Sequence, residues 1–492
     1  MDLNDYRAQI DAVDDEIVRL FVQRMELASQ IAAYKRAHDL PILQPAREQE
    51  KLDTLSAQVK DDLKAPLCRL YTLLFELSRS YQASGLHCGL LGEHLGHSYS
   101  PQLHAMLGSY RYDLYEIAPE NLAQFLRGGG FDALNVTIPY KQSVLPYCTE
   151  LSETARKIGS VNTLLRRADG TLYGDNTDCD GFLWLLKRNG GICPGEHAIV
   201  LGDGGASKTV QTVLRSLGAE VTVLSRKSAN GFDTLARYAD AVLLVNATPV
   251  GMYPDNGRRL VDLSLLPMCR CVLDLIYNPA RTRLLLDAEE RGICCENGLA
   301  MLVGQAKRAS ELFTGTTIPD SRCEEILCKL NRQMQNLILI GMPGCGKSTV
   351  GKLLAERLHR PFFDADTEIE KELGCSIPAF FAREGEDAFR RVETGVLQRL
   401  CKCSGCVIAT GGGCVTREEN YSLLHQNGKI IWLCRPLDAL PKDGRPISQS
   451  TDLAGLFEVR QPMYERFCDV TVDNQGTPEE TVETILCGGK TR

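Results

Sequence analysis

Hydrophobic positions in the first 84 residues recur about every 3.5 residues, which predicts a long helix with an apolar seam. The seam consists of Leu3, Tyr6, Ile10, Val13, Ile17, Leu20, Leu27, Ile31 and Tyr34. Pro45 predicts the start of a second, short helix, and a third helical pattern runs through Leu70, Leu73 and Leu77. This segment is therefore predicted to be all-helical and too small to bury its seam alone.

The next part of the chain alternates short apolar runs with helical patterns, which is typical of a doubly wound α/β fold. The run Ala198–Leu201 leads into Gly202-Asp203-Gly204-Gly205-Ala206 and then a helical pattern over 208–217. Glycines between strand and helix let the backbone approach a pyrophosphate, although such turns also occur without a ligand. The pattern predicts a dinucleotide-binding subdomain over about 191–299.

In the last third, the apolar run Leu337–Ile340 precedes Gly341-Met342-Pro343-Gly344-Cys345-Gly346-Lys347-Ser348, and a helical pattern follows. A strand that turns through such a loop into a helix cradles phosphates with its backbone N–H groups. Lys347 is expected to reach the terminal phosphates of ATP, and Ser348 to ligate Mg²⁺. The backbone and side-chain ATP contacts are predicted at Gly341, Gly344, Gly346, Lys347, Ser348 and Thr349.

Length and composition fit three soluble domains. The 492 residues exceed what one core supports, and soft joints near 82–85 and 314–319 divide them into 1–84, 86–330 and 335–492. The formal charge of −8 disfavours nonspecific nucleic-acid binding, and no apolar stretch is long enough for a membrane span. The polar start and the twenty scattered cysteines favour a reduced, cytoplasmic protein, and the single pair Cys403 and Cys406 is weak support for zinc.

Basic residues in the helical segment are candidate ligands for an anion. Arg24 occupies a seam position, where a guanidinium costs free energy unless an anion meets it. Lys35 follows 11 residues later, about three turns on and on nearly the same face. Arg7 lies 17 residues before Arg24, off that face, so it is expected to serve a neighbouring chain's site.

The helical segment resembles the all-helical chorismate mutases over its whole length. The matching positions are Arg7, Arg24, Lys35, Arg47, Glu48, Ser78 and Gln82. The resemblance implies an intertwined homodimer in which cations hold the carboxylates of chorismate, while Lys35 and Gln82 bind the ether oxygen, so that preorganised charge drives the rearrangement. Gln44 departs from an acidic residue common in that family. The alternative is a dimerisation or regulatory module without mutase activity.

Polar clusters upstream of the glycine turn are too specific for ordinary loops. They are 98–101, 135–141, 160–163, 174–181 and 246–252, together with Gln305. On these clusters, residues 86–330 resemble shikimate dehydrogenases, some relatives of which also oxidise quinate. The resemblance implies that 3-dehydroshikimate or shikimate is bound by Ser98, Ser100, Thr137, Asn162 and Gln305.

The same resemblance makes Lys141 and Asp178 the catalytic pair, in which the lysine transfers a proton while NADP carries the hydride. A surface ion pair is the simpler alternative. The strand 220–224 ends at cations rather than at an acid, which favours NADP over NAD. Asp203 is expected to weaken cofactor binding unless it turns away. The predicted NADP contacts are Gly202, Gly204, Gly205, Ala206, Ser225, Arg226 and Lys227.

Residues 335–492 resemble shikimate kinases through Asp364-Ala365-Asp366, Arg390, Gly411-Gly412-Gly413, Gly444-Arg445-Pro446 and Arg460. The resemblance implies that shikimate is bound by Asp366, Arg390, Gly412, Gly413 and Arg460. Asp366 would take the hydroxyl proton, Asp364 with Ser348 would hold Mg²⁺, and Arg445 would reach ATP from a short lid. A kinase for another small molecule, such as a sugar acid, is the alternative. Together the three resemblances indicate a multifunctional shikimate-pathway enzyme.

Overall fold

The computed structural model describes residues 2–38, 40, 43–96, 98–226, 231–254, 256–440, 453–488 and 490–491. Contacts between Cα atoms divide the chain into two compact units. The first unit comprises Met1–Gly191, Gly204–Gly218 and Ala300–Ile326, and the second comprises Ile192–Asp203, Ala219–Leu299 and Leu327–Arg492. The units do not follow the three predicted segments, whose boundaries remain predictions. Among the described residues, no helix combines the length and apolar character of a transmembrane span.

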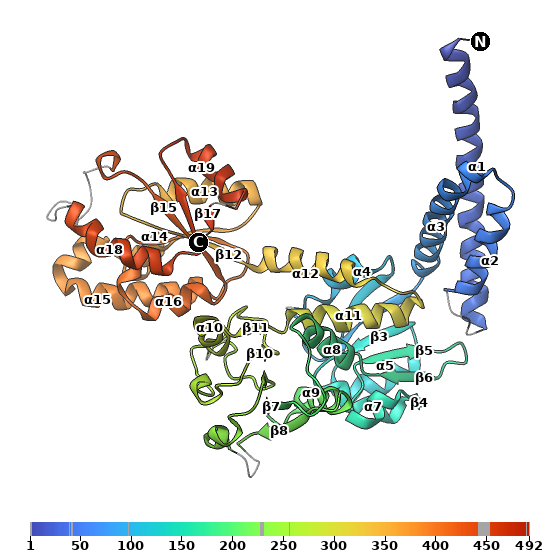
Figure 1. The fold of residues 1–492 in the computed structure, drawn as a ribbon, viewed down its shortest axis with the longest axis horizontal. Helices are drawn as coiled ribbons and strands as arrows, with labels where there is room; N and C mark the ends of the chain where they lie inside the picture. The colour runs from blue at the N-terminus through green and yellow to red at the C-terminus, as the bar shows by residue number, and fades with distance from the viewer. Residues whose placement is uncertain are drawn as a thin grey trace. The chain divides into compact units, whose positions relative to one another are not determined.

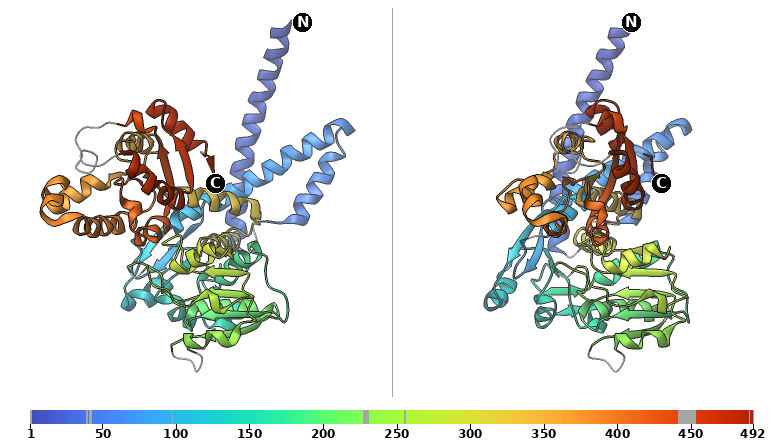
Figure 2. Two further views of the ribbon diagram at one scale, coloured as in Figure 1. Left: turned by 60° about the vertical axis from the view of Figure 1, so that its left-hand side comes forward. Right: turned by 90° about the vertical axis from the view of Figure 1, so that its left-hand side faces the viewer.

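Three helices form the N-terminal part of the first unit, as predicted: α1 (Leu3–Ala37), α2 (Pro45–Ser56) and α3 (Asp61–Ala83). The Asp2 carboxylate caps α1 by accepting from the backbone N–H of Asn4 at 2.8 Å and of Asp5 at 2.9 Å. Only the second half of α1 packs on α3, and the first half projects beyond both other helices (Figures 1 and 2).

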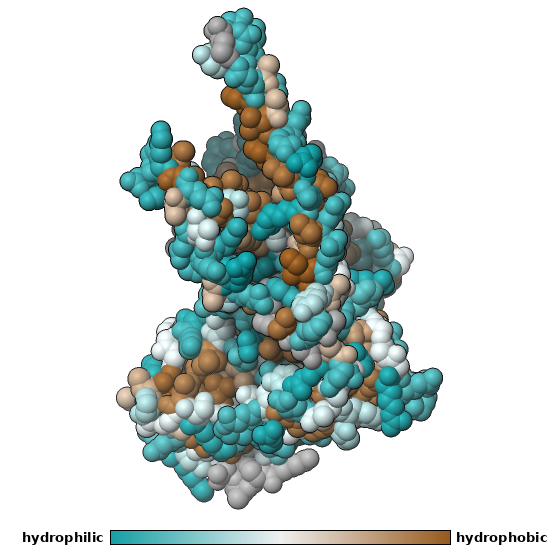
Figure 3. All heavy atoms as spheres, turned by 90° about the vertical axis from the view of Figure 1, so that its right-hand side faces the viewer, coloured by the Kyte–Doolittle hydropathy of each residue, from teal (hydrophilic) through white to brown (hydrophobic). Residues whose placement is uncertain are grey.

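The predicted seam is not the face of α1 that packs within the chain. Small side chains pack instead, since Ala28 and Ala32 are buried together with Met25. Seam residues remain exposed, for example Ile10 at 59% and Ile17 at 57%. Figure 3 shows this apolar surface as a brown stripe along the projecting part of α1. The chain therefore leaves its longest hydrophobic seam in solvent.

A six-stranded mixed sheet forms the centre of the first unit, in the order β2-β1-β3-β5-β6-β4. β1 pairs in parallel with β2 and β3, whereas β5 pairs antiparallel with both β3 and β6. The carboxyl ends of β3 and β6 therefore meet at one edge of the sheet, where side chains that follow them are brought together. The strands are β1 (His87–Gly92), β2 (Arg111–Glu116), β3 (Ala133–Val136), β4 (Glu150–Leu151), β5 (Thr163–Arg166) and β6 (Leu172–Asp175).

Helices complete the first unit. α8 and α11 approach closely at Gly181, because a Cβ there would lie 2.4 Å from the carbonyl oxygen of Met301. α9 packs against α7 and α8. The helices are α4 (Ser100–Leu107), α5 (Leu122–Gly128), α6 (Tyr140–Ser143), α7 (Glu153–Ile158), α8 (Asp178–Arg188), α9 (Gly205–Ser216) and α11 (Leu299–Thr314), and α12 (Asp320–Met334) runs from the first unit into the second.

The second unit contains a five-stranded parallel sheet in the order β11-β10-β9-β7-β8. Ala198, Ile199, Val200 and Leu201 of β7 are fully buried, as expected for a central parallel strand. The elements are β7 (His197–Leu201), β8 (Glu220–Leu224), β9 (Leu243–Asn246), β10 (Cys271–Asp274), α10 (Arg283–Glu290) and β11 (Cys294–Glu296). The expectation of a parallel α/β sheet in this part of the chain is confirmed; nucleotide binding remains a prediction.

A second sheet of this unit has the order β13-β14-β12-β15-β16-β17 and is parallel except for β17. Helices cover both of its faces (Figure 1). β12 carries the predicted apolar run and ends at the glycine loop. The elements are β12 (Asn336–Ile340), α13 (Lys347–Leu358), β13 (Phe362–Asp364), α14 (Ala365–Leu373), α15 (Ile377–Leu400), β14 (Val407–Ala409), α16 (Glu419–His425), β15 (Gly428–Cys434), α18 (Leu453–Phe467), β16 (Val470–Asp473), α19 (Pro478–Leu486) and β17 (Lys490–Thr491).

We predict that Gly181→Ala loosens the contact between α8 and α11. Its methyl group would meet backbone, which cannot rotate away, so strain of about 1–3 kcal/mol is expected. Hydrogen exchange followed by mass spectrometry should show faster exchange in peptides from both helices. Gly128→Ala is the matched control, because a Cβ there meets nothing within 4 Å. Equal exchange in the two variants would show that the close approach is unimportant.

Candidate active sites

Lys141 and Asp178 lie where β3 and β6 end, at the edge of the six-stranded sheet. Lys141 Nζ donates to Asp178 Oδ2 at 2.6 Å, and both side chains are half-buried. The second carboxylate oxygen accepts from Asn162 Nδ2 at 2.9 Å. The structure thus brings three of the predicted residues together, with both oxygens of the carboxylate occupied and the ammonium held in one place.

The orientation of Asn162 is itself fixed by buried neighbours. Its Oδ1 accepts from the backbone N–H of Thr177 at 2.7 Å and from Thr163 Oγ1 at 3.0 Å. These bonds require the amide oxygen to point at the threonines, which leaves the NH₂ group for Asp178. We did not predict roles for Thr163 and Thr177 from the sequence, although both stand in the quoted polar clusters.

The other predicted substrate residues of this segment lie in the same unit. Ser98 Oγ accepts from the backbone N–H of Ser100, the first residue of α4, at 3.2 Å. Thr137 directly follows β3, and its backbone N–H donates to Leu91. Gln305 lies on α11, and its amide donates to the carbonyl of Leu302 at 3.1 Å. All four residues therefore lie in the first unit, and the side chains of Ser98 and Gln305 are hydrogen-bonded to nearby backbone.

The predicted dinucleotide turn follows β7. Gly202 has φ 102°, and a Cβ there would lie 2.9 Å from Thr248 Cγ2, so only glycine fits. In contrast, a Cβ at Gly204 or Gly205 would meet no described atom within 4 Å. Both positions therefore border open space, and the first N–H groups of α9 lack intrahelical partners. These features fit a bound pyrophosphate.

Asp203 in this turn points toward the end of β8. Its Oδ2 accepts from Ser225 Oγ at 3.1 Å, and Ser225 is buried. Arg226 is exposed, whereas Lys227, also predicted to bind NADP, lies outside the described residues. The sequence did not reveal the direction in which Asp203 turns.

A buried network supports the loop after β9. Asn246 Oδ1 accepts from the Thr248 hydroxyl at 2.7 Å, and its Nδ2 donates to Asp274 Oδ1 at 3.0 Å. Asp274 Oδ2 accepts from Thr282 Oγ1 at 2.7 Å. Burial raises the pKa of Asp274 to about 6, against the opposing effect of these hydrogen bonds. The network holds Thr248 against Gly202, and the contribution of Asp274 was not foreseen.

A cavity of about 430 Å³ joins the glycine loop after β12 to the second glycine loop after β14. It is lined by both groups of predicted kinase residues, namely Gly344, Gly346, Lys347, Ser348, Thr349, Asp364, Asp366, Arg390, Gly412, Gly413 and Arg460. Gly341 is also constrained, since it has φ 141° and a Cβ there would lie 2.6 Å from the carbonyl oxygen of Leu433. The described residues thus line one continuous cavity between the two glycine loops.

Lys347 begins α13 and is buried. Its ammonium donates to the carbonyl oxygens of Gly341 at 2.8 Å and Met342 at 3.0 Å. The Ser348 hydroxyl donates to the Asp364 carboxylate, which also accepts from the backbone N–H of Asp366 at 3.1 Å. The predicted Mg²⁺ residues are thus neighbours. Among the described residues no three His, Cys, Asp or Glu side chains cluster for a metal, so an ion here would also need phosphate or water oxygens.

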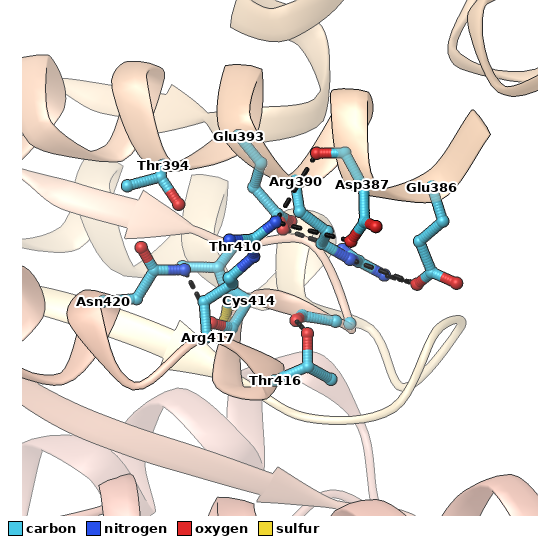
Figure 4. Close-up of polar contacts among 12 residues, drawn as sticks. Glu386, Asp387, Arg390, Glu393, Thr394, Thr410, Cys414, Thr416, Arg417 and Asn420 are labelled. Atoms are coloured by element: carbon cyan, nitrogen blue, oxygen red, sulfur yellow. Dashed lines mark hydrogen bonds and ion pairs between the residues drawn. The ribbon is translucent and has the colours of Figure 1, made fainter. Parts of the chain in front are cut away.

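Arg390 on α15 is a buried cation in the lining of this cavity (Figure 4). It donates to Glu393 Oε2 at 2.7 Å and, through Nη2, to Glu386 Oε1 at 3.0 Å. Burial opposes its charge, but the two carboxylates outweigh burial and raise the pKa of Arg390. Glu393 Oε1 is buried, and the described residues give it no hydrogen-bond partner. This oxygen can accept from a ligand hydroxyl, a role that we did not predict.

The second glycine loop packs directly on these charges. A Cβ at Gly413 would lie 2.2 Å from Arg390 Nη2, and one at Gly411 would lie 2.6 Å from Glu393 Oε1. Buried Arg460 donates to the carbonyl of Gly412 at 3.1 Å. Glycine is therefore required where the backbone meets the charged side chains. Arg445, predicted to act from a lid, lies outside the described residues.

In the helical segment, α1 and α3 meet at Arg24. Its Nη1 donates to the carbonyl of Leu74 at 3.0 Å and to the Ser78 hydroxyl, and its guanidinium lies 5.8 Å from the centre of the Phe75 ring. Burial lowers the pKa of Arg24, as it does for Lys35, and in both cases the nearby Glu48 opposes this effect. Three predicted residues therefore share one electrostatic environment.

Glu48 has a partner that we did not predict. Arg79 Nη1 donates to its two carboxylate oxygens at 2.5 and 2.6 Å, and both side chains are largely buried. Gln82, one turn further along α3, is buried, and its Oε1 has no partner among the described residues. Such an oxygen can accept a hydrogen bond from a ligand, a neighbouring chain or water.

Two other predicted residues lie away from this group. Arg7 is exposed on the projecting half of α1, and exposed Arg47 pairs with Glu50 at 2.8 Å. This position of Arg7 agrees with its predicted use by a neighbouring chain, which remains a prediction.

Three family models match successive parts of the chain. The model "Chorismate mutase type II" matches residues 6–83, "Shikimate dehydrogenase substrate binding domain" matches 90–164, and "Shikimate kinase" matches 343–487. Each match falls on one of the three residue groups described above. The predicted organisation of a helical segment, a dehydrogenase-like α/β segment and a P-loop kinase segment is confirmed.

Curated relatives match the middle of the chain. The NADP(+) shikimate dehydrogenase of Synechocystis sp. is 37% identical over 268 residues, covering 47% of this chain and 91% of that protein. The enzyme of the same name from Methanopyrus kandleri is 38% identical over 264 residues, with the same shares. A solved chorismate mutase/shikimate 5-dehydrogenase fusion protein from Clostridium acetobutylicum is 35% identical, covers 50% of this chain and 96% of that chain, and has a TM-score of 0.48. The chain belongs to the shikimate dehydrogenase family, and it carries chorismate mutase and shikimate kinase segments on either side of that part.

Proposed function

We propose that this chain is a multifunctional shikimate-pathway enzyme with three activities. It reduces 3-dehydroshikimate to shikimate with NADPH, phosphorylates shikimate with ATP to shikimate 3-phosphate, and rearranges chorismate to prephenate. The observation that carries the proposal is the match of three family models to successive segments, each of which includes residues of a charged, partly buried site. The product of the first reaction is the substrate of the second.

In the dehydrogenase reaction, Lys141 is the proposed proton donor to the carbonyl oxygen of 3-dehydroshikimate. The hydrogen bond at 2.6 Å to Asp178 keeps the ammonium in place, and Asn162 keeps the carboxylate from rotating. Ser98 and Ser100 would bind the substrate carboxylate, and Thr137, Asn162 and Gln305 its hydroxyls. NADPH supplies the hydride when bound.

The residues around the glycine turn fit a dinucleotide. Gly202 permits the turn, and Gly204, Gly205 and Ala206 leave the first N–H groups of α9 accessible to a pyrophosphate. Arg226 and Lys227 are the proposed contacts of the adenosine 2′-phosphate, and Ser225 is a proposed contact of the adenosine ribose beside it. NADP is thus the proposed cofactor, in agreement with the relatives' names.

In the kinase reaction, Arg390 and Arg460 would hold the shikimate carboxylate against the loop at Gly412 and Gly413. The orphaned Glu393 Oε1 fits a hydroxyl of the same ligand. Asp366 would accept the proton of the attacking hydroxyl. Its carboxylate lies beside that of Glu393, because a Cβ added at Gly411 would be 2.9 Å from Asp366 Oδ1 and 2.6 Å from Glu393 Oε1. Carboxylate binding, hydroxyl binding and deprotonation would thus take place in one cavity.

ATP and Mg²⁺ fit the other end of this cavity. The Lys347 ammonium would exchange the carbonyls of Gly341 and Met342 for phosphate oxygens, and the N-terminus of α13 would face the same phosphates. Ser348 and Asp364 are the proposed protein ligands of Mg²⁺, and Arg445 is a proposed further ATP contact.

In the mutase reaction, Arg24, Lys35 and Gln82 would surround chorismate, and Glu48, fixed by Arg79, would accept from its hydroxyl. The exposed seam of α1 is the proposed contact with a second copy of the chain. Burying such side chains is worth about 1.5–3 kcal/mol each, which is enough to drive association. Dimerisation would bring Arg7 of one copy toward the site of the other.

The cytoplasm is the proposed location. No two cysteines of the described residues form a disulfide, and several are buried thiols such as Cys88, Cys401 and Cys414. This thiol pattern fits a reducing compartment.

We predict that Lys141→Ala lowers the rate of 3-dehydroshikimate reduction by about 10²–10⁴-fold, because the proton donor is lost. The rate is measured from NADPH absorbance, and kinase activity in the same preparation reports that the chain is folded. Lys157→Ala, an exposed lysine paired only on the surface with Glu153, is the matched control. Comparable rates for the two variants would remove Lys141 from the reaction.

For the kinase, Gly413→Ala should raise the KM for shikimate about tenfold or more, since 1.4 kcal/mol of lost binding corresponds to tenfold. The methyl group would displace Arg390, which Glu386 and Glu393 hold in place. The KM for ATP should change little. Gly395→Ala is the control. Gly395 lies on α15, the helix that carries Arg390, and a Cβ there would meet open space. An unchanged KM for shikimate in Gly413→Ala would refute the assignment of Arg390.

For the helical segment, we predict that Arg24→Ala lowers prephenate formation about 100-fold while the chain remains dimeric, because a substrate-binding donor is removed. Ile17→Glu, on the seam, should instead dissociate the dimer. Both variants are compared with Arg19→Ala, an exposed arginine paired with Glu16, by light scattering and chorismate consumption. Absence of prephenate formation by the wild-type chain, together with loss of the dimer in Arg24→Ala, would favour a dimerisation module without mutase activity.

A further inference from the structure

The Asp203 carboxylate lies where the 2′-substituent of the cofactor's adenosine ribose is expected to bind. In nucleotide-binding folds of this kind, the residue at the end of the second strand reads that group. Here β8 is the second strand and Ser225 follows it directly. The Asp203 carboxylate accepts from the Ser225 hydroxyl at 3.1 Å, so it reaches the same position from the glycine turn.

The hydrogen bond determines what Ser225 can offer. A hydroxyl has a single proton, and the Ser225 proton is directed to Asp203. It is therefore not available to a 2′-phosphate, which requires donors. A 2′-hydroxyl has a proton of its own and can donate it to the carboxylate, as happens in sites that bind NAD.

Charge acts in the same direction. No Lys or Arg of the described residues forms an ion pair with Asp203, which is exposed at the turn. A 2′-phosphate carries up to two negative charges, and repulsion between like charges a few ångströms apart weakens binding even near solvent. The attraction of Arg226 for the phosphate is thereby partly cancelled.

We propose that Asp203 is a specificity-determining residue that reduces the preference for the 2′-phosphate, so that the dehydrogenase site binds NAD(H) as well as NADP(H). This inference rests on the proposed dehydrogenase function and refines its cofactor. The substitution Asp203→Asn removes the repulsion between Asp203 and a 2′-phosphate. It retains an oxygen acceptor for Ser225 and removes only the charge.

The test is isothermal titration of the full chain with NADP⁺ and with NAD⁺, which measures binding without catalysis. Asp203→Asn should tighten NADP⁺ about tenfold and leave NAD⁺ within about twofold or weaken it. Glu220→Gln is the matched control, because it removes one exposed negative charge from the opposite end of β8. This control should leave both dissociation constants within about twofold of the wild-type values.

Each outcome decides the proposal. An unchanged ratio of the two dissociation constants in Asp203→Asn overturns it, as does an equal shift in Glu220→Gln, which would indicate net charge alone. If neither nucleotide binds to any variant, the dehydrogenase assignment fails and the inference fails with it. If both bind to the wild type and only Asp203→Asn gains preference for NADP⁺, the inference stands.

Discussion

Each of the three candidate sites contains a cationic side chain that hydrogen bonds from its neighbours hold in one position, and this constraint is common to all three. Lys141 is held by Asp178, and Arg390 by Glu393 and Glu386. In the helical segment, Arg24 is held by neutral oxygens of α3 instead. In each case the hydrogen-bond partners hold the cationic side chain in one conformation. The side chain then loses little conformational entropy when a substrate binds.

Close backbone approach is the second shared feature, and it explains where glycine is indispensable. At Gly202 the turn passes against Thr248, and at Gly413 the loop passes against Arg390. The Thr248 side chain is in turn fixed by Asn246 and buried Asp274. Because these glycines have no side chain, the loops lie directly against buried polar groups, and those groups fix the position of the loops. The same loops would contact phosphates and carboxylates.

Sequence patterns predicted the helices, the strand–loop–helix units and most clustered residues, because these depend on local periodicity and on motif spacing. The pair Lys141 and Asp178 was predicted from the resemblance to shikimate dehydrogenases, and the structure explains their contact, because β3 and β6 end at the same edge of the sheet. Interactions between distant residues were not predictable in this way. The pairing of Arg79 with Glu48, the unsatisfied oxygen of Glu393 and the turn of Asp203 toward Ser225 depend on side-chain directions that only the packed structure shows.

The measurement that tests the account most directly supplies the purified chain with 3-dehydroshikimate, NADPH, ATP and Mg²⁺ and analyses the products by mass spectrometry. We predict shikimate 3-phosphate, formed by way of shikimate, because both sites are present in one chain. Accumulation of shikimate alone would contradict the kinase assignment of the cavity around Lys347 and Arg390. Unreacted 3-dehydroshikimate, with NADPH and with NADH alike, would contradict the dehydrogenase assignment of Lys141 and Asp178.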